Sequence, residues 1–152
     1  MRDVVDPLTA GLRATRTLQA PQHVQFDPAT QTFEVSPSAF KKQTDGTISV
    51  DLEQVPTSDN LPLDHEYPRV KRAVGLVAHT VGRLTSAGFV VTHDPIDVNA
   101  YHGLARGNPS KTERVNLADT CQIVRPLDQT EAAKQRDEAE KLRVEALRLS
   151  AT

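Results

Sequence analysis

Residues 89–107 read FVVTHDPIDVNAYHGLARG, and this stretch decides the fold. Its first five residues form a short, mostly apolar run of the kind found in buried strands, and Asp94-Pro95 ends that run. After a loop to Asn99, residues 101–107 form a second run with strand character. If the two strands are neighbours in a sheet, His93 at the end of one and His102 near the start of the other could approach each other closely.

Further elements are predicted on both sides of this stretch. Downstream, Ser110 suits the N-cap of a helix, and residues 122–124 form a last short strand before a proline. Upstream, residues 32–35 and 47–52 alternate apolar and polar positions, which is typical of half-buried strands. Asp45-Gly46 makes a turn before the second of these strands.

A long helix is predicted from Pro68 to Gly88, because proline suits a first helical turn and glycine a helix stop. Apolar side chains recur there at steps of four and three residues: Val70, Val74, Val77, Val81 and Leu84. The helix carries basic residues, whereas residues 43–68 carry acidic residues and neither lysine nor arginine. Mutual neutralisation of these segments is the favoured interpretation, and a basic binding face is the alternative.

A second helix is predicted over residues 130–149, which contain no proline or glycine and are dense in strong helix formers. One narrow seam runs along it: Ala132, Gln135, Ala139, Leu142, Ala146 and Leu149. Leu142 and Leu149 of this seam are the residues expected to bind the docking surface. Two leucines are too few for a tight isolated coiled-coil dimer, so this helix is expected to dock on its own domain or on a larger partner.

These elements predict an α+β fold, with a mixed α/β fold as the alternative: a small sheet with two packed helices and a C-terminal amphipathic helix. Residues 1–31 have only scattered apolar positions and are interpreted as a weakly structured arm, whose deletion should leave the domain folded. The expected division is therefore an arm at 1–31, a globular domain at 32–127 and a docking helix at 128–152.

Composition limits the class of protein. The chain has 152 residues, of which 38% are hydrophobic and 4% aromatic, which fits one small domain with a modest core. Its net charge of −2 gives no general attraction to nucleic acid. A single cysteine, Cys121, excludes an internal disulfide and fits a reducing cytoplasm, where it is expected to be buried. No apolar run approaches the roughly 20 residues that span a bilayer, so a cytoplasmic location without membrane contact is expected.

Candidate catalytic residues lie in and beside the loop between the strands predicted over residues 89–93 and 101–107. His93 and His102 could act as general base and general acid in phosphodiester cleavage, with Asn99 between them. Arg106 or Lys111 would then hold the phosphate. The opposing and favoured interpretation is that these are ordinary turn residues, whose side chains bond to nearby backbone groups.

The histidines of the same region could alternatively bind a metal ion. His79, His93 and His102 with Asp94 would supply enough ligands for zinc, yet their spacing matches no compact zinc signature. No cofactor and no metal are therefore predicted.

Three segments carry a family resemblance: Ser36-Pro37-Ser38-Ala39-Phe40, residues 48–51, and His93-Asp94-Pro95 followed by Asn99, His102 and Gly107. Together they resemble a group of small uncharacterised bacterial proteins that share S-x-A-F, L-S-V-D and H-D-P…N-x-x-H segments. Here Ile48 replaces the leucine, and the resemblance covers about residues 33–125. It implies a shared domain and no particular reaction.

The leading hypothesis is a non-catalytic binding or accessory subunit of a bacterial protein assembly, since catalytic motifs are weak and the chain carries an amphipathic appended helix. Its expected partner is another protein, or a second copy bound through the C-terminal helix. The alternative is a small histidine-dependent hydrolase, for example a nuclease. Convergence of the His93 and His102 rings in an open pocket would favour the hydrolase.

Overall fold

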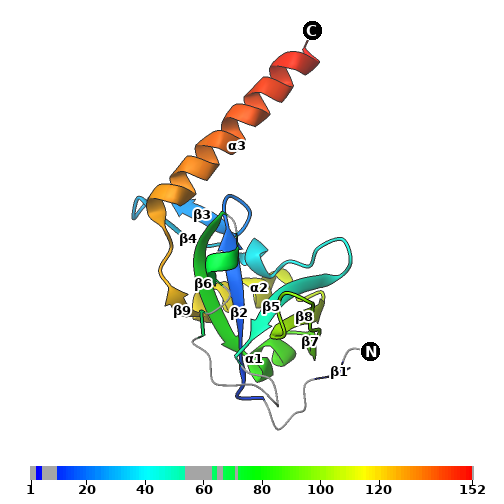
Figure 1. Ribbon diagram of the computed structural model, residues 1–152. Coiled ribbons are helices and arrows are strands. Elements are labelled where there is room, and N and C mark those ends of the chain that lie inside the picture. The colour runs from blue at the N-terminus through cyan, green and yellow to red at the C-terminus, as the bar shows by residue number, and fades with distance from the viewer. Residues whose placement is uncertain (1–2, 5–9, 54–62, 65–66, 71, 152) are drawn as a thin grey trace.

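The computed structural model describes residues 3–4, 10–53, 63–64, 67–70 and 72–151, and its main element is a seven-stranded antiparallel sheet (Figure 1). The strands of this sheet are β1 (Asp3–Val4), β2 (Arg13–Gln19), β5 (Thr47–Leu52), β6 (Ala73–Thr80), β7 (Phe89–His93), β8 (His102–Gly107) and β9 (Gln122–Arg125). Their order across the sheet is β1-β7-β8-β5-β2-β6-β9.

The remaining elements surround this sheet. A separate hairpin is formed by β3 (Val24–Asp27) and β4 (Thr32–Val35). Helical segments are the 3-10 helices η2 (Pro37–Phe40) and η3 (Tyr67–Arg69) and the α-helices α1 (Val81–Ser86), α2 (Lys111–Thr120) and α3 (Gln129–Ser150). The predicted α+β class is confirmed, as are the strands predicted over 32–35, 47–52, 89–93, 101–107 and 122–124, each within a residue or two.

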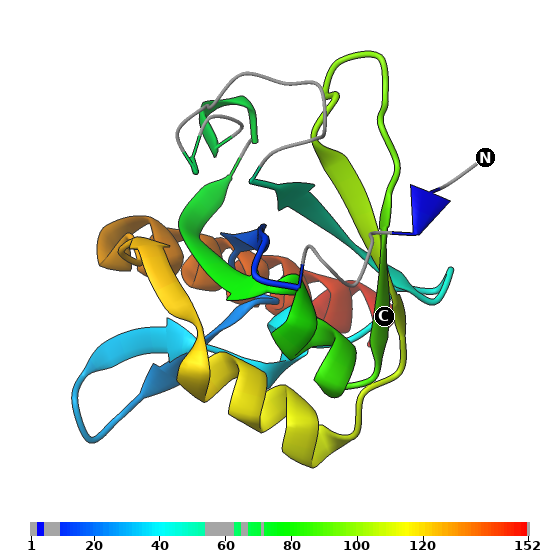
Figure 2. The same cartoon turned by 90° about the horizontal axis from the view of Figure 1, so that it is seen from below.

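One face of the sheet holds the main core. The register places Leu52, Val50 and Ala105 on this face, and α1, α2 and η2 pack against it (Figure 2). Leu117 of α2 and Phe40 of η2 are fully or almost fully buried there. The Ser110 side chain accepts a hydrogen bond from the Glu113 backbone N–H, so the predicted N-cap of α2 is confirmed.

The predicted N-terminal arm is wrong for the part of residues 1–31 that the structure describes. Strand β2 lies between β5 and β6 near the middle of the sheet, and its Leu18 is 0% exposed. The sequence of β2 does not show the apolar–polar alternation typical of a strand. Its inward positions are Ala14, Arg16 and Leu18, so a charged residue occupies the centre of the apolar series. Residues 1–2 and 5–9 lie outside the described residues. The globular domain therefore begins well before residue 32.

The predicted helix from Pro68 to Gly88 is also wrong over most of its length. Its centre is strand β6, and among the described residues only Val81–Ser86 is α-helical, while Tyr67–Arg69 forms the 3-10 helix η3. Both faces of β6 are buried, which makes the segment a nearly continuous apolar run, and such a run matches helical spacing by chance. Gly88, with φ of 108°, does follow the end of α1 as expected. The basic helical face does not exist, and residues 54–62, 65–66 and 71 lie outside the described part.

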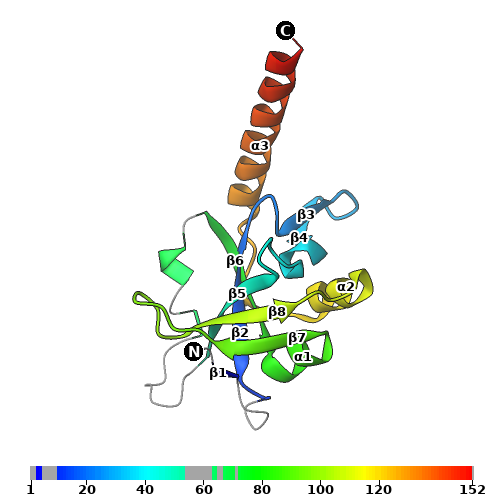
Figure 3. The ribbon, with the colours of Figure 1, turned by 90° about the vertical axis from the view of Figure 1, so that its right-hand side faces the viewer.

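Helix α3 is attached to the body at its N-terminal end only (Figures 1 and 3). The Gln129 side-chain amide accepts from the Phe33 backbone N–H at 2.6 Å and donates to the Phe33 carbonyl at 3.0 Å. Ala132 and Gln135 are buried, and the Arg136 guanidinium lies over the Phe33 ring. Farther along the helix, Glu138 forms an ion pair with Arg72 at 3.7 Å, and beyond this contact the helix projects away from the sheet.

The sheet is split along part of its length. Strands β2 and β5 pair only at Ala14 with Leu52 and at Thr15 with Asp51. Each strand continues to pair fully with its other neighbour, β6 or β8. The two halves of the sheet therefore diverge beyond Thr15, and this divergence positions the pocket described below.

Candidate functional site

The predicted catalytic histidines lie on opposite faces of the β7–β8 pair. His93 is directly opposite Gly103, and the Asp94 backbone N–H donates to the His102 carbonyl. Because successive side chains of a strand point to opposite faces, His93 lies on the face of Gly103 and His102 on the other. The two rings are therefore not arranged to act on one group.

Each of the three predicted catalytic residues is already engaged locally. His93 donates from Nε2 to the Ala100 carbonyl at 2.7 Å, and His102 donates from Nδ1 to the Asp94 carbonyl at 2.9 Å. Asn99 donates from Nδ2 to Asp51 Oδ1 at 2.6 Å and accepts the backbone N–H of the residue two positions on. These contacts hold the loop between β7 and β8 in shape, as the turn interpretation predicts.

The conditional metal set does not come together. His79 lies in the core, where its Nε2 donates to the Leu117 carbonyl at 2.8 Å and its ring meets Phe40 edge to face. Burial lowers the pKa of His79, so the ring is neutral. Only His102 and Asp94 approach each other, at 3.6 Å, and no cluster among the described residues has three groups that could hold a metal ion.

The predicted phosphate ligands are on the surface. Arg106 is an exposed residue of β8 opposite Thr47, and its charge adds to a hydrogen bond from the Thr47 hydroxyl in lowering the pKa of Asp45. Lys111 is the exposed first residue of α2. Among the described residues, no hydrogen bond or ion pair joins Arg106 or Lys111 to His93 or His102.

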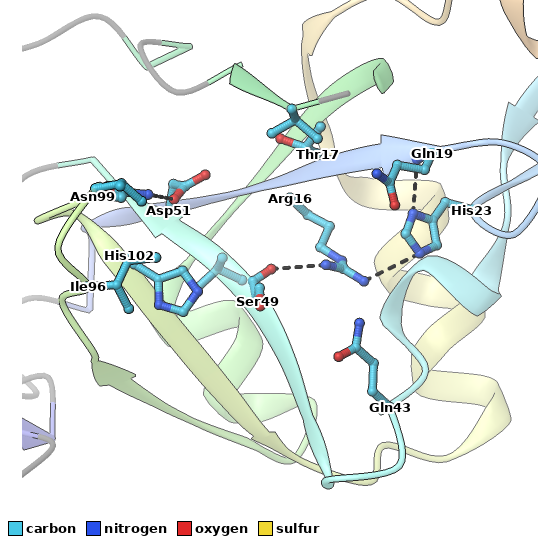
Figure 4. Close-up of a pocket in the computed structure, with 13 residues that line it drawn as sticks. Arg16, Thr17, Gln19, His23, Gln43, Ser49, Asp51, Ile96, Asn99 and His102 are labelled. Atoms are coloured by element: carbon cyan, nitrogen blue, oxygen red, sulfur yellow. Dashed lines mark hydrogen bonds between the residues drawn. The ribbon is translucent and has the colours of Figure 1, made fainter. Parts of the chain in front are cut away.

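A pocket of about 400 Å³ opens where β2 and β5 diverge (Figure 4). Residues of the split strands line it together with the β7–β8 loop and the β2–β3 turn. Its polar lining includes Arg16, His23, Gln43, Asp51 and His102, and its apolar lining includes Val50, Val70, Ile96 and Val98. A volume of this size is within the range of small-molecule sites.

Arg16 fills the split between the two strands. Its Nη1 donates to the Ser49 carbonyl and its Nε to the Ala39 carbonyl, both at 3.1 Å, while its Nη2 lies 3.4 Å from His23 Nε2. The Ser49 carbonyl belongs to the stretch of β5 that has lost its β2 partner, so the guanidinium replaces a missing ladder bond. Arg16 is only 8% exposed, and burial lowers its pKa to about 10, which leaves it charged at neutral pH.

The predicted binding residues of α3 are strongly exposed. Leu142 is 73% and Leu149 63% exposed, and Val144 and Leu147 are also largely exposed. Of the seam residues, Ala132 and Gln135 are buried against the domain and Ala139 is half-buried. The predicted helix is confirmed, and its C-terminal half is a projecting surface.

Sequence reasoning missed Arg16 and His23. A charged residue between Ala14 and Leu18 in an alternating series could have identified an inward arginine once β2 was recognised as a strand. Nothing local could have identified His23, whose position depends on the turn after β2. Cys121 is partly buried at the edge of the core, where burial raises its pKa, in keeping with the expected packing role.

Comparison with protein-family models, with curated proteins and with solved structures gives no match. The resemblance to the small bacterial group stays a prediction. Within the described residues, no helix combines the length and the apolar character that crossing a bilayer requires.

Proposed function

We propose that the protein is a non-catalytic binding subunit that docks to a partner protein through the projecting half of α3. The observation that carries this proposal is the exposure of a regular apolar stripe on a helix anchored only at its N-terminal end. The stripe consists of Ala139, Leu142, Ala146 and Leu149 and is called the α3 stripe below. A bacterial assembly in the cytoplasm is the setting expected from the sequence.

A projecting helix of this kind needs a partner to gain from its apolar residues. Isolated helical segments of this length are marginal in water, and most helical stability comes from burying an apolar face. The stripe begins at a groove of about 400 Å³ between α3 and the body, lined by Ala20, Pro21, Ala139 and Leu142 among others. A partner helix lying on the stripe would therefore also contact the turn after β2.

Charge and side-chain size describe this partner. The stripe has Glu138 and Glu145 along one flank and Arg136 and Arg143 along the other, which favours a partner helix with the opposite charge arrangement. The alanines leave space for large apolar side chains of the partner.

A second copy of the chain supplies only Leu142 and Leu149 as large apolar side chains, so a homodimer through the stripe would bury four leucines. Burying a leucine is worth about 1.5–3 kcal/mol, whereas association costs about 4–15 kcal/mol, so a homodimer held by Leu142 and Leu149 alone is marginal. A different protein is therefore the favoured partner.

The alternative function, a histidine-dependent hydrolase, has less support. It requires His93 and His102 to act on one bond, and their positions on opposite faces of the β7–β8 pair do not favour that.

The test begins with site-specific photocrosslinking in the source cell. A photoreactive residue at Glu145, on the flank of the stripe, should give a defined adduct, and one at Val144, on the opposite side of α3, should not. The crosslinked protein is then purified, and its affinity for the full chain is measured by calorimetry.

Matched variants decide whether the stripe is the contact. We expect Leu142→Asp with Leu149→Asp to weaken binding at least tenfold, because both aspartates would be buried without partners. Val144→Asp with Ala151→Asp adds the same charge on the other side and should change affinity less than twofold. Equal loss in both pairs, absence of an adduct specific to Glu145, or a stable homodimer in light scattering would each overturn the proposal.

A further inference from the structure

The pocket between β2 and β5 contains two hydrogen-bond donors that face each other. Arg16 Nη2 and His23 Nε2 are 3.4 Å apart, and the dashed line that joins them in Figure 4 is a hydrogen bond only if His23 Nε2 carries no proton. This feature is separate from the α3 stripe, and the inference drawn from it does not depend on the proposed partner.

The first donor belongs to a buried cation that has no counter-ion among the residues the structure describes. The Arg16 guanidinium donates hydrogen bonds to the carbonyls of Ser49 and Ala39, which carry no net charge, and no ion pair between described residues includes it. A buried charge normally has an opposite charge beside it, because removal from water is costly. The pocket therefore offers a place for a negative group.

The second donor is fixed by the tautomer of His23. Its Nδ1 accepts the Gln19 backbone N–H at 3.0 Å, so the single proton of the neutral ring must be on Nε2. Burial first, and the charge of Arg16 second, lower the pKa of His23 to about 4, so the ring is neutral at pH 7. His23 Nε2 thus cannot accept a bond from Arg16, and no described residue supplies an acceptor for either Arg16 Nη2 or His23 Nε2.

We propose that this pocket binds a small monocarboxylic acid, one of whose carboxylate oxygens accepts hydrogen bonds from both Arg16 Nη2 and His23 Nε2. The acid's apolar body then lies against Val50 and toward Ile96 and Val98, which line the same pocket. The Gln43 side chain lies near the guanidinium and points toward it (Figure 4).

The charge of the pocket selects a monoanion. Among the residues that line the pocket, Arg16 is the one arginine or lysine, and Asp51 adds a carboxylate. A singly charged carboxylate balances Arg16, whereas a phosphate dianion would bring a further negative charge toward Asp51.

Nuclear magnetic resonance of the wild-type protein tests the premise directly. Long-range proton–nitrogen spectra should show the Nε2–H tautomer of His23 at pH 7. Titration with sodium acetate, butyrate, hexanoate and inorganic phosphate should give saturable shifts at His23 and at Arg16 Nε for the carboxylates. Hexanoate should bind at least tenfold more tightly than acetate, since its extra methylene groups are buried.

Variants locate the binding. His23→Phe removes the donor while keeping a ring, and Arg16→Lys removes the planar fork, so each should weaken hexanoate binding at least tenfold. Arg106→Gln removes an exposed positive charge elsewhere and should leave the affinity within twofold of the wild type. If Arg16→Lys does not fold, the affinity of His23→Phe for hexanoate and the wild-type spectra still test whether the pocket binds a carboxylate.

Four results would overturn the proposal. These are an Nδ1–H tautomer of His23, no saturable shift with any carboxylate, tighter binding of phosphate than of hexanoate, and unchanged hexanoate affinity in His23→Phe.

Discussion

Acidification should destabilise the fold through His23 in a way that can be isolated from all other titrating groups. The pKa of His23 is lowered from 6.5 to about 4 in the folded protein, by burial first and by Arg16 second. Between these values the unfolded chain binds a proton that the folded chain does not. Stability from this group is therefore complete above pH 6.5, falls as the pH drops through this window, and is lost below pH 4.

The size of the effect follows from the same two values. Full conversion of the shift gives a loss of about 2 kcal/mol between pH 8 and pH 5. His23 is only partly buried, so solvent screening reduces the expected loss to about 1 kcal/mol. His79, whose pKa burial also lowers, adds a loss of the same sign.

Urea unfolding followed by circular dichroism at pH 8, 6.5 and 5 measures this loss in the wild type and in His23→Gln. The variant keeps an acceptor for the Gln19 N–H, and every other titrating group is common to both proteins. The wild type should lose about 1 kcal/mol more than the variant between pH 8 and 5, a difference of about 0.5 M in urea midpoint. Equal losses in the two proteins, or a larger loss in the variant, would refute the assignment of a buried neutral ring.

Two further predictions concern the sheet. Deletion of residues 1–31 removes β2 from the middle of the sheet, so the truncated chain should show no cooperative unfolding transition in calorimetry; a sharp transition would contradict the central position of β2. Gly103→Ala should destabilise the protein by about 1–3 kcal/mol, because its Cβ would lie 2.9 Å from the Thr92 carbonyl oxygen. Gly11→Ala, where no atom lies within 4 Å, is the matched control in urea unfolding, and similar costs for both would argue against that close approach.

Local sequence patterns correctly predicted elements that have one buried face and one exposed face. Strand β5 alternates buried and more exposed positions, and α2 begins at a side chain that caps it, so both were predicted correctly. Strand β6 failed because it is buried on both faces: a run such as Ala73–Ala78 carries no alternation that separates a strand from a buried helix. Its β-branched residues were the available indication of a strand, and Gly75 disfavoured an uninterrupted helix.

The pocket could not be predicted for a different reason. It exists because β2 and β5 stop pairing beyond Thr15. No local sequence pattern specifies where two strands whose paired residues are 36 and 38 positions apart will diverge. Arg16, Ala39 and Ser49 meet only in the folded sheet. The histidines of the β7–β8 loop were found from sequence because their spacing is local, and the same locality explains why they bond to their own loop.

The contact that anchors α3 also protects the protein from joining edge to edge with other chains. An open strand edge presents backbone N–H and carbonyl groups that another chain can pair with, which is a common route to aggregation. The Gln129 amide occupies both such groups of Phe33 on β4, as a neighbouring strand would. A chain shortened before residue 129 would therefore expose this edge, and its loss of solubility would be a property of β4, separate from any loss of partner binding.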